Sequence, residues 1–224
     1  MNYRVLGWPP DGPRLALDYR AFVYAGKFHT PKTGVTVVTD SSARPTSALD
    51  LDGPEPAPPP AGTAWTTTEE PVVAAVACNA DRTDETVVWL RYVTVRVDRR
   101  GAGLGGRLAA FTAERAATEG YQTARIAVNN AFSYRALSKA GFEFTGRETG
   151  LAELVLERSI ETAVHPTETA AHPTETATRP DPDSYRDGLE RLRNRAETSD
   201  AEAAALERWL ADGDPPPLVS RPWA

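Results

Sequence analysis

The order of apolar and polar residues along the chain predicts a sheet-forming first half and an alternation of helices and strands after it. Thr86–Val97 is the strongest strand candidate, because it is rich in β-branched and aromatic residues and is apolar on both faces. Thr63–Thr68 and Pro71–Cys78 are expected to pair as a hairpin. The other predicted strands are Tyr3–Leu6, Gly34–Thr39, Thr123–Val128, Phe142–Thr145 and Leu151–Arg158.

Three segments of the first 160 residues have the apolar spacing of helices. They are Leu15–Phe28, Gly103–Glu119 and Asn130–Ala140. Glycines follow the last two, at Gly120 and Gly141, where helices commonly end. Strands that alternate with helices predict an α/β fold with parallel pairing in the middle of the sheet.

The remaining segments divide the chain. Residues 41–62 are dense in proline and poor in apolar residues, which predicts a disordered insert. The motif HPTETA occurs twice, at His165 and His172, and predicts a flexible linker over residues 161–182. Two helices, Asp183–Ala196 and Asp200–Ala211, are expected to form a hairpin within residues 183–224. Residues 1–160 are therefore the expected main domain, with the hairpin appended to it.

Composition restricts the partners and the compartment. The chain has 31 acidic and 25 basic residues, a net charge of −6, which gives no general attraction to nucleic acid or to anionic lipid. Cys78 is the single cysteine, so an intrachain disulfide is excluded. No apolar stretch has the length of a signal peptide or of a membrane-spanning helix. We expect a cytoplasmic protein that binds neither membrane nor nucleic acid.

The segment Arg100–Gly106, RGAGLGG, lies between the strongest strand and a predicted helix. The start of a helix exposes unpaired N–H groups and a partial positive charge, and glycines let a ligand approach them closely. Arg99 and Arg100 add formal positive charge just ahead of the glycines. The loop therefore predicts a site for phosphate or pyrophosphate. The alternative interpretation is a tight strand-to-helix turn whose arginines are solvated.

Two common phosphate-binding motifs fit this loop poorly. Gly101, Gly103 and Gly106 match the dinucleotide pattern GxGxxG, but the next strand ends in Asn129 and Asn130 where a Rossmann site places an acidic residue. An NAD-dependent oxidoreductase is thus the weaker alternative. A Walker A loop would end in Gly-Lys-Ser/Thr, and this chain has no lysine there.

The loop and its neighbours resemble the GNAT (GCN5-related N-acetyltransferase) superfamily. The family's acetyl-coenzyme A loop reads Q/R-x-x-G-x-G/A, matched here by Arg100, Gly103 and Gly105. VTVRVDRRG resembles the end of the family's fourth strand, and NNAFSYRALSKAGF resembles its following helix, which closes in Gly-Phe. The resemblance covers residues 87–144 closely and residues 3–158 by the order of elements. It implies a mixed sheet of six or seven strands, splayed between the fourth and the fifth and flanked by helices.

The same resemblance implies a cofactor site with acetyl-CoA as the acyl donor. Its expected residues are Val95 and Val97 for the pantetheine arm, Arg100, Gly101, Gly103, Leu104, Gly105 and Gly106 for the pyrophosphate, and Asn130 and Ser133 from the next helix. No metal is implied. His165 and His172 are two histidines of the predicted linker, and a metal site would need a third ligand beside them.

Catalytic groups are harder to assign. Many relatives place a proton-donating tyrosine four residues before the final Gly-Phe pair, where this chain has Leu137. Tyr134, one helical turn earlier, is the expected substitute or else a packing residue. Strand alternation turns one of Arg91 and Tyr92 towards the cleft.

The sequence does not assign the general base that would accept the proton of the amine. Glu85 and Glu143 are the nearby carboxylates, and a chain of waters is the alternative. Cys78, in an apolar strand, is expected to be a buried hydrophobe rather than a nucleophile, and His29 to be a solvated loop residue.

Two classes of function follow from these interpretations. The first is an acetyl-CoA-dependent N-acetyltransferase that transfers the acetyl group directly to a small-molecule or peptide amine in a ternary complex. The second is a non-catalytic CoA-binding sensor or interaction module, suggested by Leu137 in the position of the usual acid. The acceptor and homodimerisation are left open, because a fold does not choose a substrate.

Overall fold

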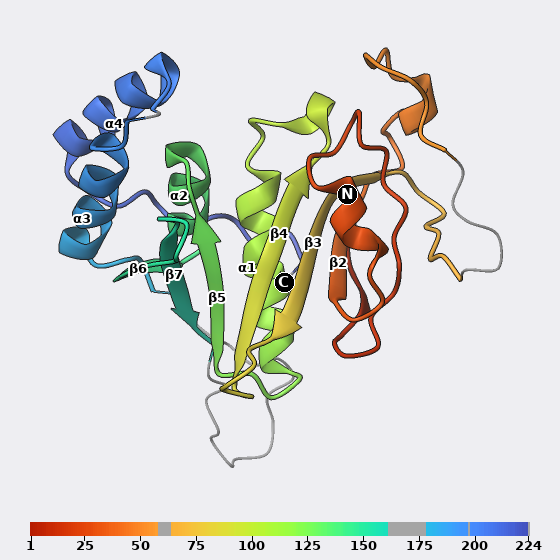
Figure 1. Ribbon diagram of the computed structural model, residues 1–224, viewed down its shortest axis with the longest axis horizontal. Coiled ribbons are helices and arrows are strands. Elements are labelled where there is room, and N and C mark those ends of the chain that lie inside the picture. Colours follow the sequence, from red (N-terminus) through yellow and green to blue (C-terminus); the bar gives the residue numbers. More distant parts are fainter. Residues whose placement is uncertain (58–63, 161–177, 197, 224) are drawn as a thin grey trace.

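The computed structural model describes residues 1–57, 64–160, 178–196 and 198–223. Its centre is a seven-stranded sheet in the order β1-β2-β3-β4-β5-β7-β6 (Figure 1). The strands are β1 Asn2–Gly7, β2 Gly34–Thr39, β3 Val72–Ala80, β4 Val87–Val95, β5 Thr123–Val128, β6 Glu143–Glu148 and β7 Leu154–Ser159. All neighbours are antiparallel except β4 and β5, which are parallel. The predicted mixed sheet with parallel pairing in its middle is confirmed.

Four α-helices accompany the sheet in the described part of the chain. They are α1 Leu104–Ala117, α2 Ala131–Ser138, α3 Pro182–Arg193 and α4 Asp200–Asp212. Helix α1 lies behind the sheet and packs on β3 and β4, whereas α3 and α4 stand at the edge formed by β6 (Figure 1). Three short 3-10 helices are η1 Ala25–His29, η2 Thr46–Ala48 and η3 Val97–Arg99. None of the described helices is both long and apolar enough to cross a membrane.

Strand β2 shows why the first half reads as continuous apolar runs. Val35 and Val37 face one buried cluster and Val38 faces the other, so both sides of the strand are covered. On the α1 side, Thr36 shares a hydrogen bond of 2.6 Å with Thr112, which satisfies two hydroxyls in the core. A strand buried on both faces carries no polar alternation.

The segment that covers the second face is not the helix predicted over Leu15–Phe28. The Leu15 N–H donates to the Phe28 carbonyl at 2.9 Å, so the chain doubles back as a loop in which only Ala25–His29 is helical. Phe22 and Phe28 are buried against the sheet. The apolar residues of Leu15–Phe28 are spaced as in a helix, but they belong to a loop that packs on the sheet. Tertiary packing thus outweighed helix propensity in this segment.

The predicted hairpin of Thr63–Thr68 with Pro71–Cys78 is also wrong. Thr66 bridges in parallel to Leu15, and its N–H donates to the Arg14 carbonyl at 2.8 Å. Strand β3 pairs instead with β2 and β4. The turn between the two segments lacks the Gly or Asn that a tight hairpin favours, which is consistent with this outcome.

The proline-rich insert predicted over residues 41–62 is packed in its first part. Ala43 is buried, and the Arg44 carbonyl accepts a 2.9 Å hydrogen bond from the buried guanidinium of Arg96. The prediction of disorder is wrong for this part, because the guanidinium of a core arginine needs these partners. Residues 58–62 lie outside the described residues.

The predicted linker over residues 161–182 falls mostly outside the described residues, including both copies of HPTETA. The helices after it are confirmed as α3 and α4. They share one buried cluster with the sheet and α1, because Tyr185, Leu189 and Leu206 are buried in it. The C-terminal helices are therefore part of the main core, not an independent appendage.

Candidate functional site: a cleft between β4, β5 and the start of α1

The two parallel strands at the centre of the sheet separate along their length. Strand β4 pairs with β5 through Val87, Val88 and Trp89, which lie opposite Thr123, Ala124 and Arg125. After these three pairs, β4 and β5 no longer pair with each other. Beyond these pairs, β4 continues along β3 and β5 continues along β7. The carboxyl-terminal halves of β4 and β5 therefore diverge, and their facing edges carry no strand-to-strand hydrogen bonds.

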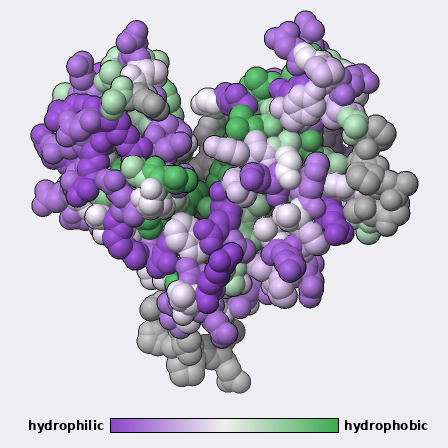
Figure 2. All heavy atoms as spheres, in the orientation of Figure 1, coloured by the Kyte–Doolittle hydropathy of each residue, from purple (hydrophilic) through white to green (hydrophobic). Residues whose placement is uncertain are grey.

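A cavity of about 300 Å³ occupies this divergence, and we call it the inner cleft. Tyr92, Val93 and Val95 of β4 line one side, and Ile126 and Val128 of β5 line the other. The further lining residues are Tyr24, Arg91, Gly105, Gly106, Ala127, Asn129, Asn130, Ser133, Ala136, Leu137 and Glu153. Figure 2 shows a notch in the surface between the part that carries α2, α3 and α4 and the part that carries the first strands.

A second cavity, of about 490 Å³, continues from the first and is called the outer cleft. The two share Val95, Gly105, Gly106, Ser133 and Ala136. The other residues of the outer cleft are Arg99, Arg100, Gly101, Gly103, Leu104, Phe132, Arg135, Lys139, Trp209 and Val219. Four of these are basic and none of the described ones is acidic, in a chain of net charge −6. The outer cleft is suited to an anion.

Helix α1 opens into this cleft without a cap. Its N-cap residue is Gly103, which has a left-handed backbone (φ 74°), and no side-chain hydrogen bond caps the helix. By contrast, Asn130, Asp181 and Ser199 cap α2, α3 and α4 through their side chains. The first N–H groups of a helix have no partner inside it, so those of α1 are left for an external acceptor.

Two glycines let the cleft exist. A Cβ on Gly106 would lie 2.5 Å from the Ala136 carbonyl oxygen, so the absence of a side chain lets α1 and α2 touch. A Cβ on Gly105 would make ordinary contacts with Val95 and Val93, at 3.5 and 3.6 Å, and would fill space at the junction of the two clefts. The donors, the positive charge and the open backbone fit a phosphate group carried on an extended apolar arm.

The model of the acetyltransferase (GNAT) family matches residues 37–142, which include β4, the glycine loop, α1, β5 and α2. Residues 37–142 are a GNAT acetyltransferase domain. The mixed seven-stranded sheet with its parallel β4–β5 pair has the fold of that family.

Solved structures resemble the chain only in part. A putative GNAT-family acetyltransferase from Desulfovibrio desulfuricans is 16% identical over 42% of this chain and 66% of that one, just under two thirds, with a TM-score of 0.38. An N-acetyltransferase from Thermoplasma acidophilum in complex with coenzyme A is 13% identical over 42% and 57% of the two chains (TM-score 0.35). The ribosomal-protein-S18-alanine N-acetyltransferase from Escherichia coli is 17% identical over 46% and 71% (TM-score 0.35). No curated protein matches the sequence.

The residues expected to bind the donor in this acetyltransferase domain come together with one exception. Val95, Arg100, the four glycines, Leu104, Asn130 and Ser133 all line the inner or the outer cleft. Val97 does not: its N–H donates to the Ala21 carbonyl at 3.0 Å, and its side chain is exposed. Strand β4 ends at Val95 and turns into η3, so strand alternation stops before Val97. Val93, two residues before Val95, lines the cleft instead.

Asn130 and Ser133 have their own structural roles at the start of α2. The Asn130 Oδ1 accepts the Ser133 N–H at 2.8 Å, which caps the helix, and its Nδ2 donates to the Asn129 Oδ1 at 3.3 Å. The position of Asn130 at the cleft thus has a structural reason independent of any ligand. The Ser133 hydroxyl has no hydrogen-bond partner among the described residues and lines both clefts.

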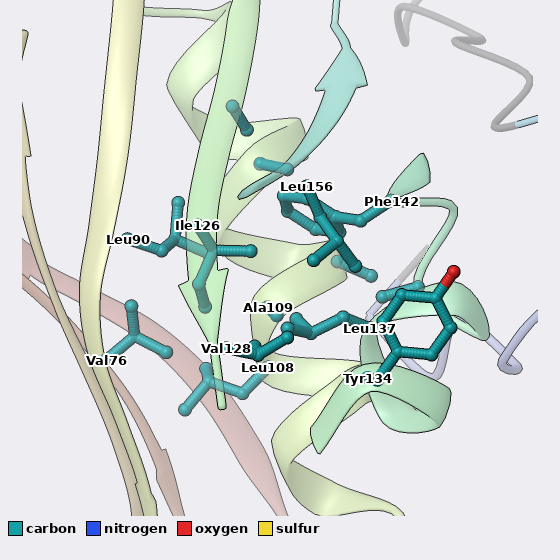
Figure 3. Close-up of a cluster of buried hydrophobic side chains, with 14 of the residues drawn as sticks. Val76, Leu90, Leu108, Ala109, Ile126, Val128, Tyr134, Leu137, Phe142 and Leu156 are labelled. Atoms are coloured by element: carbon teal, nitrogen blue, oxygen red, sulfur yellow. The ribbon is translucent and has the colours of Figure 1, made fainter. Parts of the chain in front are cut away.

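Tyr134 is not in the site, contrary to the prediction that it replaces the missing acid. Its side chain is buried, stacks on Tyr185 of α3 with ring centroids 5.6 Å apart, and donates to the Tyr185 carbonyl at 3.0 Å. Figure 3 shows its hydroxyl pointing away from Ile126 and Val128 of β5. Burial raises the pKa of this phenol above its ordinary range, which also disfavours proton transfer. Ser133, Ala136 and Leu137 are the α2 residues that line the inner cleft.

The inner cleft holds other ionisable side chains. Arg91 and Tyr92 both line it, because β4 has a bulge in which Tyr92 pairs with Ala77, Leu90 pairs with Cys78 and Arg91 is the extra residue. Tyr24 and Glu153 also line the cleft, and no sequence pattern pointed to them.

The carboxylates considered from sequence lie elsewhere. The Glu143 carboxylate accepts from the Ser184 hydroxyl at 3.0 Å, and Glu85 is exposed before β4. Neither lines a cleft. Among the described residues, Glu153 is the one carboxylate that lines the inner cleft.

The remaining candidates are structural. Burial raises the pKa of the Cys78 thiol to about 12, so it is a packed thiol with little thiolate at neutral pH. His29 packs edge-on against Trp65, with ring centroids 4.9 Å apart. Within the described residues, no three His, Cys, Asp or Glu side chains are grouped as metal ligands.

Proposed function

We propose that this chain is an acetyl-CoA-dependent N-acetyltransferase that transfers the acetyl group directly to an amine in a ternary complex. The uncapped N-terminus of α1, open to a basic cleft that continues into the β4–β5 divergence, carries the proposal. The two joined cavities suit the two halves of the donor, a polyanionic nucleotide and a pantetheine arm. The acceptor is a small-molecule or peptide amine.

The chain's own residues divide the work between the two clefts. The N–H groups at the start of α1, with Arg100, bind the pyrophosphate. The facing edges of β4 and β5 offer unpaired backbone groups to the amides of the arm. The donor supplies a thioester, and a backbone N–H on β4 beyond Trp89 stabilises the charge that develops on its carbonyl oxygen.

Proton transfer is assigned to two residues of the inner cleft. Tyr92 lies on the splayed part of β4, next to Val93, and its phenol protonates the departing thiolate. Glu153 precedes β7 and accepts the proton of the amine. The Glu153 carboxylate also accepts a 3.1 Å hydrogen bond from the Thr149 hydroxyl, which holds it in place.

The test is thiol release from acetyl-CoA by the purified chain, measured against a panel of amines, together with calorimetric binding of CoA. We expect turnover with at least one class of amine. Gly103→Val should abolish CoA binding, because it replaces a residue that needs φ of 74° at the start of α1. Gly120→Val is the control: Gly120 also has positive φ (91°) but lies after α1, where an added Cβ meets nothing.

Two outcomes would contradict the proposal. Equal loss of binding in both glycine variants would mean that the effect is general strain. Stabilisation of the fold by NAD but not by CoA in thermal melting would favour the oxidoreductase instead.

A non-catalytic CoA-binding module is the second candidate, favoured by one observation. Leu137, in the position where the family resemblance implies a tyrosine, lines the inner cleft. An apolar side chain there supplies no proton. Tight CoA binding with no thiol release across the whole panel would favour this candidate over the enzyme.

A further inference from the structure

The outer cleft has a wall that comes from outside the matched acetyltransferase domain. Trp209 of α4 and Val219 of the following tail line it together with Phe132 and Arg135 of α2 and with Lys139, the C-cap residue of α2. The family match ends at residue 142. The C-terminal segment of this chain thus contributes directly to a cavity that begins at the glycine loop.

This wall is held in place at both of its ends. On one side, Tyr185 of α3 stacks on Tyr134 of α2. On the other, the Val219 N–H donates to the Lys139 carbonyl at 2.8 Å, and the Trp223 indole donates to the Glu114 carboxylate at 2.8 Å. The tail therefore crosses from α2 to α1 and fixes Val219 beside the cleft.

The wall is aromatic and partly exposed. The Trp209 and Phe132 rings meet edge to face with centroids 6.0 Å apart, and 51% of Phe132 is exposed. The Arg135 guanidinium lies 4.7 Å from the centre of the Trp209 ring. Exposed aromatic rings beside a cavity are a surface on which a planar base can stack.

Positive charge lies next to these rings. Lys139, one of three lysines in the chain, and Arg100 have no carboxylate partner among the described residues. Arg99 differs, since it pairs with Asp40 at 3.2 Å and with Asp98 at 3.7 Å. Two cations near an aromatic wall suit a phosphorylated nucleotide better than an apolar ligand.

We infer that the C-terminal segment forms the binding wall for the nucleotide end of coenzyme A. The adenine ring lies against Trp209, Phe132 and Val219, and Lys139 binds the phosphate on the ribose. This inference rests on the proposed function and extends it: cofactor affinity depends on helices that lie outside the acetyltransferase domain.

The experiment measures binding of three probes to the full chain by calorimetry: CoA, dephospho-CoA, which lacks the ribose phosphate, and pantetheine, which lacks the nucleotide. Trp209→Leu should lower the affinity for CoA about tenfold, as expected for the loss of a base-stacking ring, and leave the affinity for pantetheine unchanged. Trp209→Phe keeps a ring and should restore most of the affinity. Lys139→Gln should weaken CoA but not dephospho-CoA.

The control is Trp89→Leu, the same substitution at a tryptophan of β4 that lines neither cleft. Wild-type affinity for CoA in a folded Trp209→Leu chain, or in the Lys139→Gln chain, would overturn the corresponding contact. These failures differ from that of the proposed function, in which the wild-type chain binds neither CoA nor pantetheine. Circular dichroism of each variant compares its total helical content with that of the wild-type chain.

Discussion

Helices α1 and α2 begin side by side at the same cleft, yet their N-termini are built in opposite ways. Helix α1 starts at a glycine with no side-chain cap, and its first N–H groups lie beside basic residues. Helix α2 starts at Asn130, whose own side chain caps it, and buries its tyrosine against α3. A helix end closed by its own side chain serves the fold, whereas an open end beside a cavity is available to a ligand.

Helices α1 and α2 are brought together by a close contact at Gly106. Gly106→Ala places a methyl group 2.5 Å from the Ala136 carbonyl, and we expect it to cost about 3 kcal/mol of stability by overpacking. Gly105→Ala, one residue away, meets only ordinary contacts and should keep wild-type stability while weakening CoA. Denaturant unfolding of both variants provides the measurement, and equal stabilities would show that the two helices are not in tight contact.

The open end of α1 is tested by giving it a carboxylate. Gly103→Asp should lower the affinity for CoA about 100-fold, or about 2.7 kcal/mol of binding free energy, because it places a negative charge where the phosphates are proposed to bind. Gly103→Asn has the same shape without the charge, and both residues tolerate positive φ better than most. If the two variants bind CoA equally well in calorimetry, charge at the start of α1 is not what selects the ligand.

The closed end of α2 should respond in stability and not in binding. Asn130→Ala removes the cap and should cost about 1 kcal/mol, while Asn130→Asp retains a capping oxygen and should cost less. Thermal unfolding measures the difference, and CoA titration is expected to show no change in Asn130→Ala. A large loss of CoA affinity in that variant would restore Asn130 as a ligand contact.

Tyr134 gives the smallest effect and the clearest separation of the two helices. Tyr134→Phe removes a hydroxyl that donates to the Ser184 and Tyr185 carbonyls of α3 and should cost at most about 1 kcal/mol, with kcat unchanged. Tyr92→Phe in the inner cleft is its comparator and should lower kcat on the order of 100-fold. Steady-state kinetics of the two variants side by side would reverse our assignment if Tyr134→Phe were the slower enzyme.

Periodicity predicted the sheet well because most strands face packed neighbours on at least one side. Gly34–Thr39 and Thr123–Val128 match β2 and β5 to the residue. It failed at Leu15–Phe28, where the apolar residues cover a sheet as a loop, since the spacing of a folded loop can imitate that of a helix.

The open start of α1 was predictable because glycines before a helix permit positive φ and a close approach to the backbone, which is a local property of the sequence. The ionisable side chains that line the inner cleft were not predictable, because their placement depends on contacts distant in sequence. The bulge that turns both Arg91 and Tyr92 to the cleft arises from pairing with β3, and Tyr134 is drawn away by α3. Val93 was within reach of sequence reasoning, since it lies two residues before Val95 on the same strand face.

One contact links regions that the sequence keeps far apart. The Trp223 ring packs on Tyr3 of β1 with centroids 4.7 Å apart and on Phe111 of α1 at 5.6 Å. Trp223, near the C-terminal end, thus connects β1, the outermost strand of the sheet, to α1, the helix whose start lies at the cleft. Clipping the tail before Arg221 would therefore uncover the Tyr3 and Phe111 rings and remove the Trp223–Glu114 hydrogen bond, and Val219 would keep only its bond to Lys139.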